Sequence, residues 1–160
     1  MPTFYKKNGF TLIETLLYTA MVSMVVGALL LIVYNIVISR EWLDRSLSLT
    51  ENKKFLIQKI VWVLQNVSAV NAPAPDETSG ILSVNKIGGS TNPIVVDASS
   101  GIVRITSGGE NPFNLTTSDI TASNILFEHA STTAYEWMRM TGELWNTAGS
   151  TTLDYTFVLR

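Results

Sequence analysis

The fold is decided by residues 15–39, which read TLLYTAMVSMVVGALLLIVYNIVIS. This stretch of 25 residues holds no Asp, Glu, Lys or Arg. As an α-helix it would be about 37 Å long, enough to cross a hydrocarbon core of about 30 Å with some tilt. The sequence therefore predicts a membrane-spanning helix near the start of a 160-residue chain.

Two other interpretations of this stretch are weaker. A chain of 160 residues is too small to surround 25 apolar residues with protein on all sides, which disfavours a buried helix of a soluble domain. A cleavable secretory signal would have an apolar region of only about 7–15 residues, followed by a cleavage site between small residues. The run here is longer, so we expect the helix to remain in the mature protein.

A short motif stands directly before the apolar run. It reads Lys6-Lys7-Asn8-Gly9-Phe10-Thr11-Leu12-Ile13-Glu14. Two basic residues, a Gly-Phe junction and a Glu five residues after the Gly resemble the amino terminus of type IV pilins and of the pseudopilins of type II secretion systems. The resemblance covers residues 1–40 and implies a prepilin.

The resemblance implies a set of site residues and partners. A membrane-embedded prepilin peptidase would remove the leader, residues 1–9, by cutting after Gly9, and would methylate the new terminal amine on Phe10. Glu14 would pair with the terminal amine of a neighbouring subunit and so set the register of assembly. The implied partners are this peptidase, other pilin or pseudopilin subunits contacted through the helix, the inner-membrane assembly platform and the lipid bilayer.

The residue types suit these roles. Gly9 has no side chain, so a protease can approach its extended backbone closely. A carboxylate at the edge of an apolar environment costs several kcal/mol unless it finds a partner. Pairing would therefore make Glu14 a register device. The alternative for Glu14 is a charge that reaches the membrane interface without a partner.

The charges around the span do not agree with the implied orientation. Only Lys6 and Lys7 precede it, whereas Arg40, Arg45, Lys53 and Lys54 follow closely. A count of Lys and Arg would place the leader outside, because cytoplasmic flanks carry the excess of basic residues. The resemblance implies a cytoplasmic leader, and we follow it in expecting a single-pass inner-membrane protein that later joins a periplasmic or cell-surface filament.

Residues 40–72 are predicted to continue the same helix, to about Val70, in amphipathic form. Apolar residues recur there at spacings of three and four, as expected for one buried face. They are Leu43, Leu47, Leu56, Ile60, Val63, Leu64 and Val67. Trp42 suits the membrane interface, and Trp62 is expected to pack under a sheet. In the membranous half, Ala20, Ser23 and Gly27 place small residues on one side, which permits close helix packing or has no special role.

Residues 73–160 are predicted to form a β-rich head. Asn71-Ala72-Pro73-Ala74-Pro75 separates it from the helix, because proline cannot continue a helix. Short alternating or β-branched runs, separated by Gly- and Ser-rich turns, predict strands. These runs are residues 81–87, 94–96, 102–106, 124–129, 135–140 and 153–159. The predicted fold class is α+β, pilin-like, with one long N-terminal helix packed against a small antiparallel sheet.

The composition excludes several functions. The chain has no Cys and one His, so thiolate metal sites, a cysteine nucleophile and disulfides are excluded. Residues 73–160 carry four basic and nine acidic residues, a net charge of −5, which makes nucleic acid an unlikely partner. No catalytic or phosphate-binding motif surrounds His129 or the Gly-Gly pairs. We therefore expect no cofactor, no metal and no enzyme.

Aromatic residues give a second candidate site in the head. Tyr135, Trp137 and Trp145 form either an aromatic patch for a glycan or a partner, or ordinary core and strand packing, which we consider the better interpretation. Three functions thus remain. The first is a structural subunit of a type IV pilus or type II pseudopilus, with the absence of proline between Pro2 and Pro73 favouring a minor subunit. The second is a pilus-tip binding module, and the third, remote, is a membrane-anchored extracytoplasmic enzyme.

Overall fold

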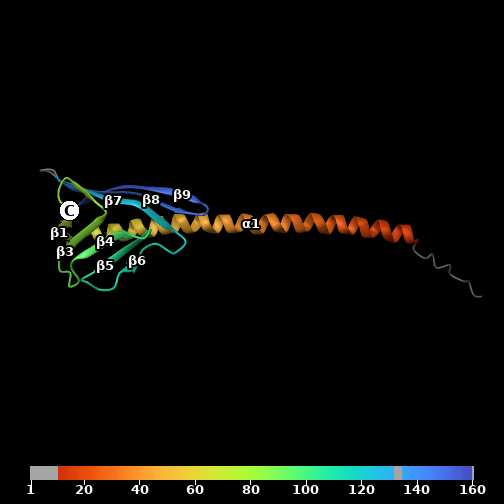
Figure 1. The fold of residues 1–160 in the computed structure, drawn as a ribbon, viewed down its shortest axis with the longest axis horizontal. Coiled ribbons are helices and arrows are strands. Elements are labelled where there is room, and N and C mark those ends of the chain that lie inside the picture. Colours follow the sequence, from red (N-terminus) through yellow and green to blue (C-terminus); the bar gives the residue numbers. More distant parts are fainter. Residues whose placement is uncertain (1–10, 132–134, 160) are drawn as a thin grey trace, which may run out of the picture. The chain divides into compact units, whose positions relative to one another are not determined.

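The computed structural model describes residues 11–131 and 135–159. The chain divides into two units, Met1–Trp42 and Leu43–Arg160. Within the described residues, the first unit consists of the first part of one long helix, and the second contains the rest of this helix and every strand. The layout is α+β, with an apolar N-terminal helix followed by antiparallel sheets (Figure 1).

Helix α1 spans Leu12–Leu64 and begins after a residue suited to that position. The backbone N–H groups of Glu14 and Thr15 donate to the carbonyl oxygen of Thr11, at 3.1 and 3.2 Å. Thr is favoured just before the first helical turn, and Glu14 places a negative charge near the positive end of the helix dipole. No proline interrupts the helix, so its backbone hydrogen bonds continue unbroken.

The helix ends at Leu64, earlier than predicted. Asn66 has a φ of 56°, the left-handed conformation that commonly terminates helices and that Asn tolerates. Strand β1, Val67–Ala72, follows immediately. The prediction that residues 40–72 are helical to about Val70 is therefore wrong at its end, because the left-handed Asn66 turns the chain and the next residues pair as a strand.

The strands form two antiparallel sheets. The first sheet has five strands in the order β1-β3-β4-β5-β6, and the second has four in the order β2-β7-β8-β9. In the first sheet the remaining strands are β3 (Ile81–Lys86), β4 (Ile94–Ser99), β5 (Ile102–Ser107) and β6 (Phe113–Asn114). The second sheet consists of β2 (Glu77–Ser79), β7 (Thr121–Ser131), β8 (Glu136–Asn146) and β9 (Gly149–Leu159).

Each of the six predicted runs overlaps a strand, but the predicted single sheet is wrong. Strands β7, β8 and β9 are 11 residues each, longer than predicted. Strands β1, β2 and β6 were not predicted. The last two have three and two residues, too few to produce a period-two pattern. With these additions the strands separate into two sheets that share one core.

The core of the second unit combines the last turns of α1 with side chains of both sheets. In Figure 1 the yellow end of α1 runs between the two sheets. Leu56, Ile60 and Val63 are fully buried, and so are Phe127 and Met140 from the second sheet. Burial of a side chain of this size stabilises a fold by about 1.5–3 kcal/mol. This helical stripe is therefore what fixes the head to its helix.

The buried stripe is shorter than the sequence predicted. Leu43 and Leu47 expose 51% and 58% of their surface, and burial begins at Leu49. Trp62 does not pack under a sheet, because 46% of it is exposed. Its ring instead contacts Lys86, whose Nζ lies 3.9 Å from the ring centroid and donates to the carbonyl oxygen of Trp62 at 2.7 Å. Desolvation in this contact lowers the pKa of Lys86.

A β-bulge shapes the second sheet between β7 and β8. Ser123 pairs with Glu143 and Leu126 with Thr141, so two residues of β7 oppose the single Gly142 of β8. Asn124, in the bulge, has a φ of 52°. A Cβ atom at residue 142 would lie 2.5 Å from a methyl carbon of Ile125 and 3.2 Å from its Cα. The bulge therefore requires a glycine at residue 142.

We predict that Gly142→Ala destabilises the protein by about 1–3 kcal/mol, the usual cost of forcing an extra methyl group into packed structure. Thermal or urea unfolding of the full chain in detergent would measure this difference.

Gly149→Ala is the matched control. Gly149 has a φ of 157°, against 156° for Gly142, but a Cβ atom there would meet nothing within 4 Å. Equal destabilisation by the two substitutions would show that the backbone angle matters and that the clash with Ile125 does not.

Candidate functional site

The predicted processing site lies at the start of the chain. Gly9 and Phe10 fall outside the described residues. Glu14 lies in the first turn of α1 and is half-buried. No charged residue lies between Glu14 and Arg40. If residues 15–39 are placed in an environment without water, the carboxylate of Glu14 therefore lies at the edge of that environment.

The first part of α1 is covered with apolar side chains that contact little else in the chain. The large apolar residues between Leu12 and Ile38 each expose between 47% and 83% of their surface. By length and composition this helix is able to cross a membrane. An apolar surface this continuous is unusual in a protein dissolved as a monomer, and it indicates contact with lipid or with other helices.

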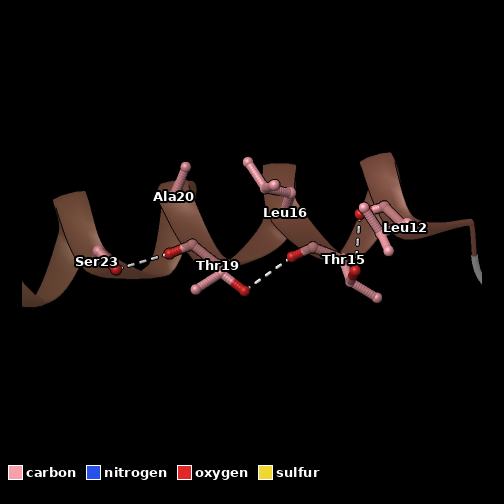
Figure 2. Close-up of a pocket in the computed structure, with 6 residues that line it drawn as sticks. All are labelled: Leu12, Thr15, Leu16, Thr19, Ala20 and Ser23. Carbon is pink, nitrogen blue, oxygen red and sulfur yellow. Dashed lines mark hydrogen bonds between the residues drawn. The ribbon is translucent and has the colours of Figure 1, made fainter.

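Hydroxyl groups on this part of the helix are satisfied by the helix itself. Figure 2 shows one face, where Thr19 donates to the carbonyl oxygen of Thr15 at 2.8 Å and Ser23 to that of Thr19 at 2.8 Å. The Thr15 hydroxyl donates to the carbonyl oxygen of Leu12 at 2.9 Å. Leu16 and Ala20 complete the face (Figure 2). No hydroxyl of this face therefore needs water or a partner helix as acceptor.

The same pattern extends further along α1. Gly27 follows Ser23 by four residues, and a Cβ atom there would meet nothing within 4 Å. The Asn35 side chain donates to the carbonyl oxygen of Leu31 at 2.9 Å. The side chains of Thr15, Thr19, Ser23 and Asn35 are thus bonded to the backbone, which lowers the cost of placing them in an apolar environment.

The head is attached to α1 by polar contacts beside the buried stripe. Ser48 donates to a carboxylate oxygen of Asp119 at 2.9 Å, and the backbone N–H of Thr117 donates to the side-chain oxygen of Asn52 at 3.1 Å. Hydrogen bonds from Thr117 and Ser48 lower the pKa of the Asp119 carboxyl below its ordinary value of 3.8. These contacts hold the loop between β6 and β7 against the helix.

A second anchor connects α1 to the last strand. Lys53 Nζ donates to the carbonyl oxygen of Thr152 at 2.8 Å and to the hydroxyl of Thr151 at 3.1 Å. The ammonium group also lies 5.7 Å from the ring centroid of Tyr155. Strand β9 is therefore held from its helix side as well as by its pairing with β8.

The aromatic candidates of the head divide into two groups. Tyr135 and Trp137 lie in one groove on the outer face of β8 and β9, together with Val158. Trp145 lies on the same face of β8 and is 46% exposed, but eight residues along a strand separate it from Trp137 by about 27 Å. The sequence favoured core and strand packing. The strand part is confirmed for Trp137 and Trp145, which lie on β8, but core packing is wrong for Tyr135 and Trp145, which are 59% and 46% exposed.

Charged side chains adjoin the groove. Arg139 and Asp154 form two parallel hydrogen bonds, from Nε at 2.8 Å and from a terminal nitrogen at 2.9 Å. Glu128 stands opposite Arg139 on the neighbouring strand β7. The hydrogen bonds to Asp154 are the main cause that raises the pKa of Arg139 above its ordinary value, and Glu128 adds a smaller effect. Arg139 in turn lowers the pKa of the Asp154 carboxyl.

His129 is directed into the core and away from this groove. It is 3% exposed, and its Nδ1 lies 3.0 Å from the carbonyl oxygen of Pro73. A carbonyl can only accept, so Nδ1 carries the hydrogen. Among the described residues, Nε2 is buried without a hydrogen-bond partner. Within residues 11–131 and 135–159, no group of three or more acidic or His side chains is placed to hold a metal ion.

Comparisons of the chain with family models, with curated protein sequences and with solved structures find no match.

Sequence reasoning did not find the residues that join the head to its helix or the charged pair of the groove. Asn52 and Thr117 are 65 residues apart in the sequence, and Arg139 and Asp154 are 15 residues apart. One signal was available for the pair. If Thr147 and Ala148 had been recognised as a two-residue hairpin loop, the register of β8 and β9 would have followed.

We predict that Asp119→Asn reduces the loss of stability in acid. Because the pKa of Asp119 is lower in the folded state, its contribution is fully present above pH 3.8 and is lost as the pH falls through the folded-state value. The variant lacks this contribution at every pH, so the free energy of unfolding is lower than wild type at pH 7 and approaches wild type below the folded-state pKa.

Urea unfolding of the full chain in detergent, repeated from pH 7 down to pH 2.5, would test this expectation. Glu110→Gln, on an exposed turn, is the control and should follow the wild-type curve. Some acid sensitivity should remain in Asp119→Asn, because Asp154 also has a lowered pKa. Parallel curves for wild type and Asp119→Asn would contradict the assignment.

Proposed function

We propose that this chain is a structural subunit of a type IV pilus or of a type II secretion pseudopilus, made as a membrane-anchored prepilin. The observation that carries this proposal is the motif 6–14, with Gly9, Phe10 and Glu14, placed directly before 25 uncharged residues. These residues belong to a helix long and apolar enough to cross a membrane. The helix continues into a head with two antiparallel sheets, a layout compatible with a pilin-like fold.

Cleavage between Gly9 and Phe10 would change the chemistry of the helix start. The leader with Lys6 and Lys7 is removed, and a new cationic amine forms at Phe10, four residues before Glu14. Since the cut lies before the apolar stretch, the protein stays anchored. Prepilin peptidase is the enzyme that would make this cut and methylate Phe10.

Assembly would then exchange lipid contacts for contacts with neighbouring subunits. The exposed apolar surface of α1 can pack against the same surface of other copies, as the hydroxyl groups of Thr15, Thr19 and Ser23 are already bonded within the helix. In apolar surroundings an unpaired carboxylate or amine costs several kcal/mol. Pairing of Glu14 with the amine of a neighbour avoids this cost at one axial offset, which selects the register.

In cells that contain the peptidase, we expect mass spectrometry to find a mature protein that begins with methylated Phe10. Gly9→Leu should remain uncut, because the side chain prevents close approach of the protease to the backbone. Thr3→Leu, elsewhere in the leader, is the matched control and should be processed normally. An intact Met1 in wild type from such cells would exclude the proposal.

We expect Glu14→Val to be inserted and cut as wild type but to enter filaments about tenfold less or worse, since loss of one such pair exceeds about 1.4 kcal/mol. The fraction of protein in sheared or purified filaments, compared with the membrane fraction, measures this. Glu51→Val removes the same charge from an exposed position of α1 and should assemble normally. Normal assembly of Glu14→Val would rule out the register role.

A further inference from the structure

The outer face of the β8–β9 hairpin holds a groove of about 550 Å³. It is lined by Tyr135, Trp137, Arg139, Asp154, Thr156 and Val158. Alternate residues of β8, among them Met138 and Met140, are fully buried on the opposite face. The core is therefore packed by the opposite face of β8, and the side chains that line the groove contribute little to it.

The groove has an apolar end and a polar end. Trp137 stands directly opposite Val158, and Tyr135 adjoins them with 59% of its surface exposed. One step along the strands, Arg139 stands opposite Thr156, and Asp154 lies beside both. Sites for small molecules commonly have this composition, with aromatic walls and a few polar groups that fix orientation.

The charges of the groove do not favour an anion. Arg139 is already paired through two hydrogen bonds with Asp154, and Glu128 lies opposite it on β7. Among the described residues, the lining of the groove holds one positive and one negative charge, and Glu128 adds a second negative charge beside it. An anionic ligand would have to displace a carboxylate from Arg139 and would meet the repulsion of the other.

The same pair can bind neutral hydroxyl groups. A guanidinium has five N–H donors, of which two are used in the bonds with Asp154. The carboxylate of Asp154 keeps lone pairs that can accept, and Thr156 adds a hydroxyl that can do both. Donors and acceptors side by side, next to flat aromatic surfaces, match a ring that carries hydroxyl groups around its edge and C–H groups on its faces.

We propose that the outer face of the β8–β9 hairpin binds a neutral oligosaccharide, with a sugar ring stacked on Trp137 and Tyr135 and its hydroxyl groups bonded to Arg139, Asp154 and Thr156. An extended chain fits better than a single sugar, because the same face continues past Thr141 to Trp145. The site concerns the head alone and goes beyond the assembly role, so it holds whether or not the chain enters a filament.

Binding can be tested with the full chain in a polyoxyethylene detergent, which avoids the sugar headgroups of glycosidic detergents. The probes are maltohexaose, cellohexaose, xylohexaose and mannohexaose, with hexagalacturonic acid as the anionic comparison, and calorimetry measures affinity. We expect saturable binding of at least one neutral hexamer and at least tenfold weaker binding of the acid. Absence of binding by all four neutral hexamers would overturn the proposal.

Variants locate the site. Trp137→Ala and Tyr135→Ala should each weaken binding about tenfold or more, the usual effect of removing a central aromatic contact, and Trp137→Phe should keep most of it. Trp62→Ala, an exposed Trp on α1, is the control and should bind as wild type. Thermal unfolding checks that Trp137→Ala still folds, and Tyr135→Ala, at an exposed position, supplies the answer if it does not.

Two results would contradict the proposal in different ways. Unchanged affinity in both folded aromatic variants would place sugar binding elsewhere. Loss of filament incorporation by Tyr135→Ala or Trp137→Ala, without any sugar binding by wild type, would assign this face to a protein interface instead. Failure of the assembly role is recognised separately, by an uncut amino terminus with sugar binding intact.

Discussion

The molecule depends on one constraint, which is that the first part of α1 must be kept out of water. Its apolar side chains are exposed along the whole helix surface, and no charge interrupts them between Glu14 and Arg40. The helix also satisfies the hydroxyl groups of Thr15, Thr19 and Ser23 with its own carbonyl oxygens. Lipid and an apolar bundle of helices therefore suit it equally, and a transfer between them requires no new polar contact along this face.

Beyond Arg40 the same helix changes its surroundings. Charged residues appear first. From Ser48 onward, polar contacts at Ser48 and Asn52 lie beside a buried stripe that starts at Leu49 and continues to Leu64. The head has no disulfide, so β9 is held by pairing with β8 along its whole length and by Lys53.

The sequence was sufficient for elements whose signal is local and long. The uncharged run, the spacing of Leu56, Ile60 and Val63 by four and three residues, and the alternation of β3 to β5 and of β7 to β9 all predicted the observed type of structure. The end of α1 was missed because one backbone angle at Asn66 decides it, against a helical pattern of apolar residues that continues to Val70. The division into two sheets was missed because β1, β2 and β6 depend on pairing between distant segments.

The distinction between local patterns and long-range pairing also explains which candidate site residues could be predicted from the sequence. Gly9, Phe10 and Glu14 lie within one stretch of six residues, so a motif suffices to single them out. Arg139, Asp154 and Glu128, in contrast, come together only through the register of three strands.

That register has a functional consequence, because it places core and groove on opposite faces of one strand. Met138, Met140 and Leu144 bury their side chains, and Trp137, Arg139 and Trp145 point to the other side. The bulge in β7 opposite Gly142 accommodates one extra residue of β7, so the alternation of buried and exposed side chains along β8 is not disturbed. The outer face can therefore acquire or change a binding specificity without altering the packing that joins the head to α1.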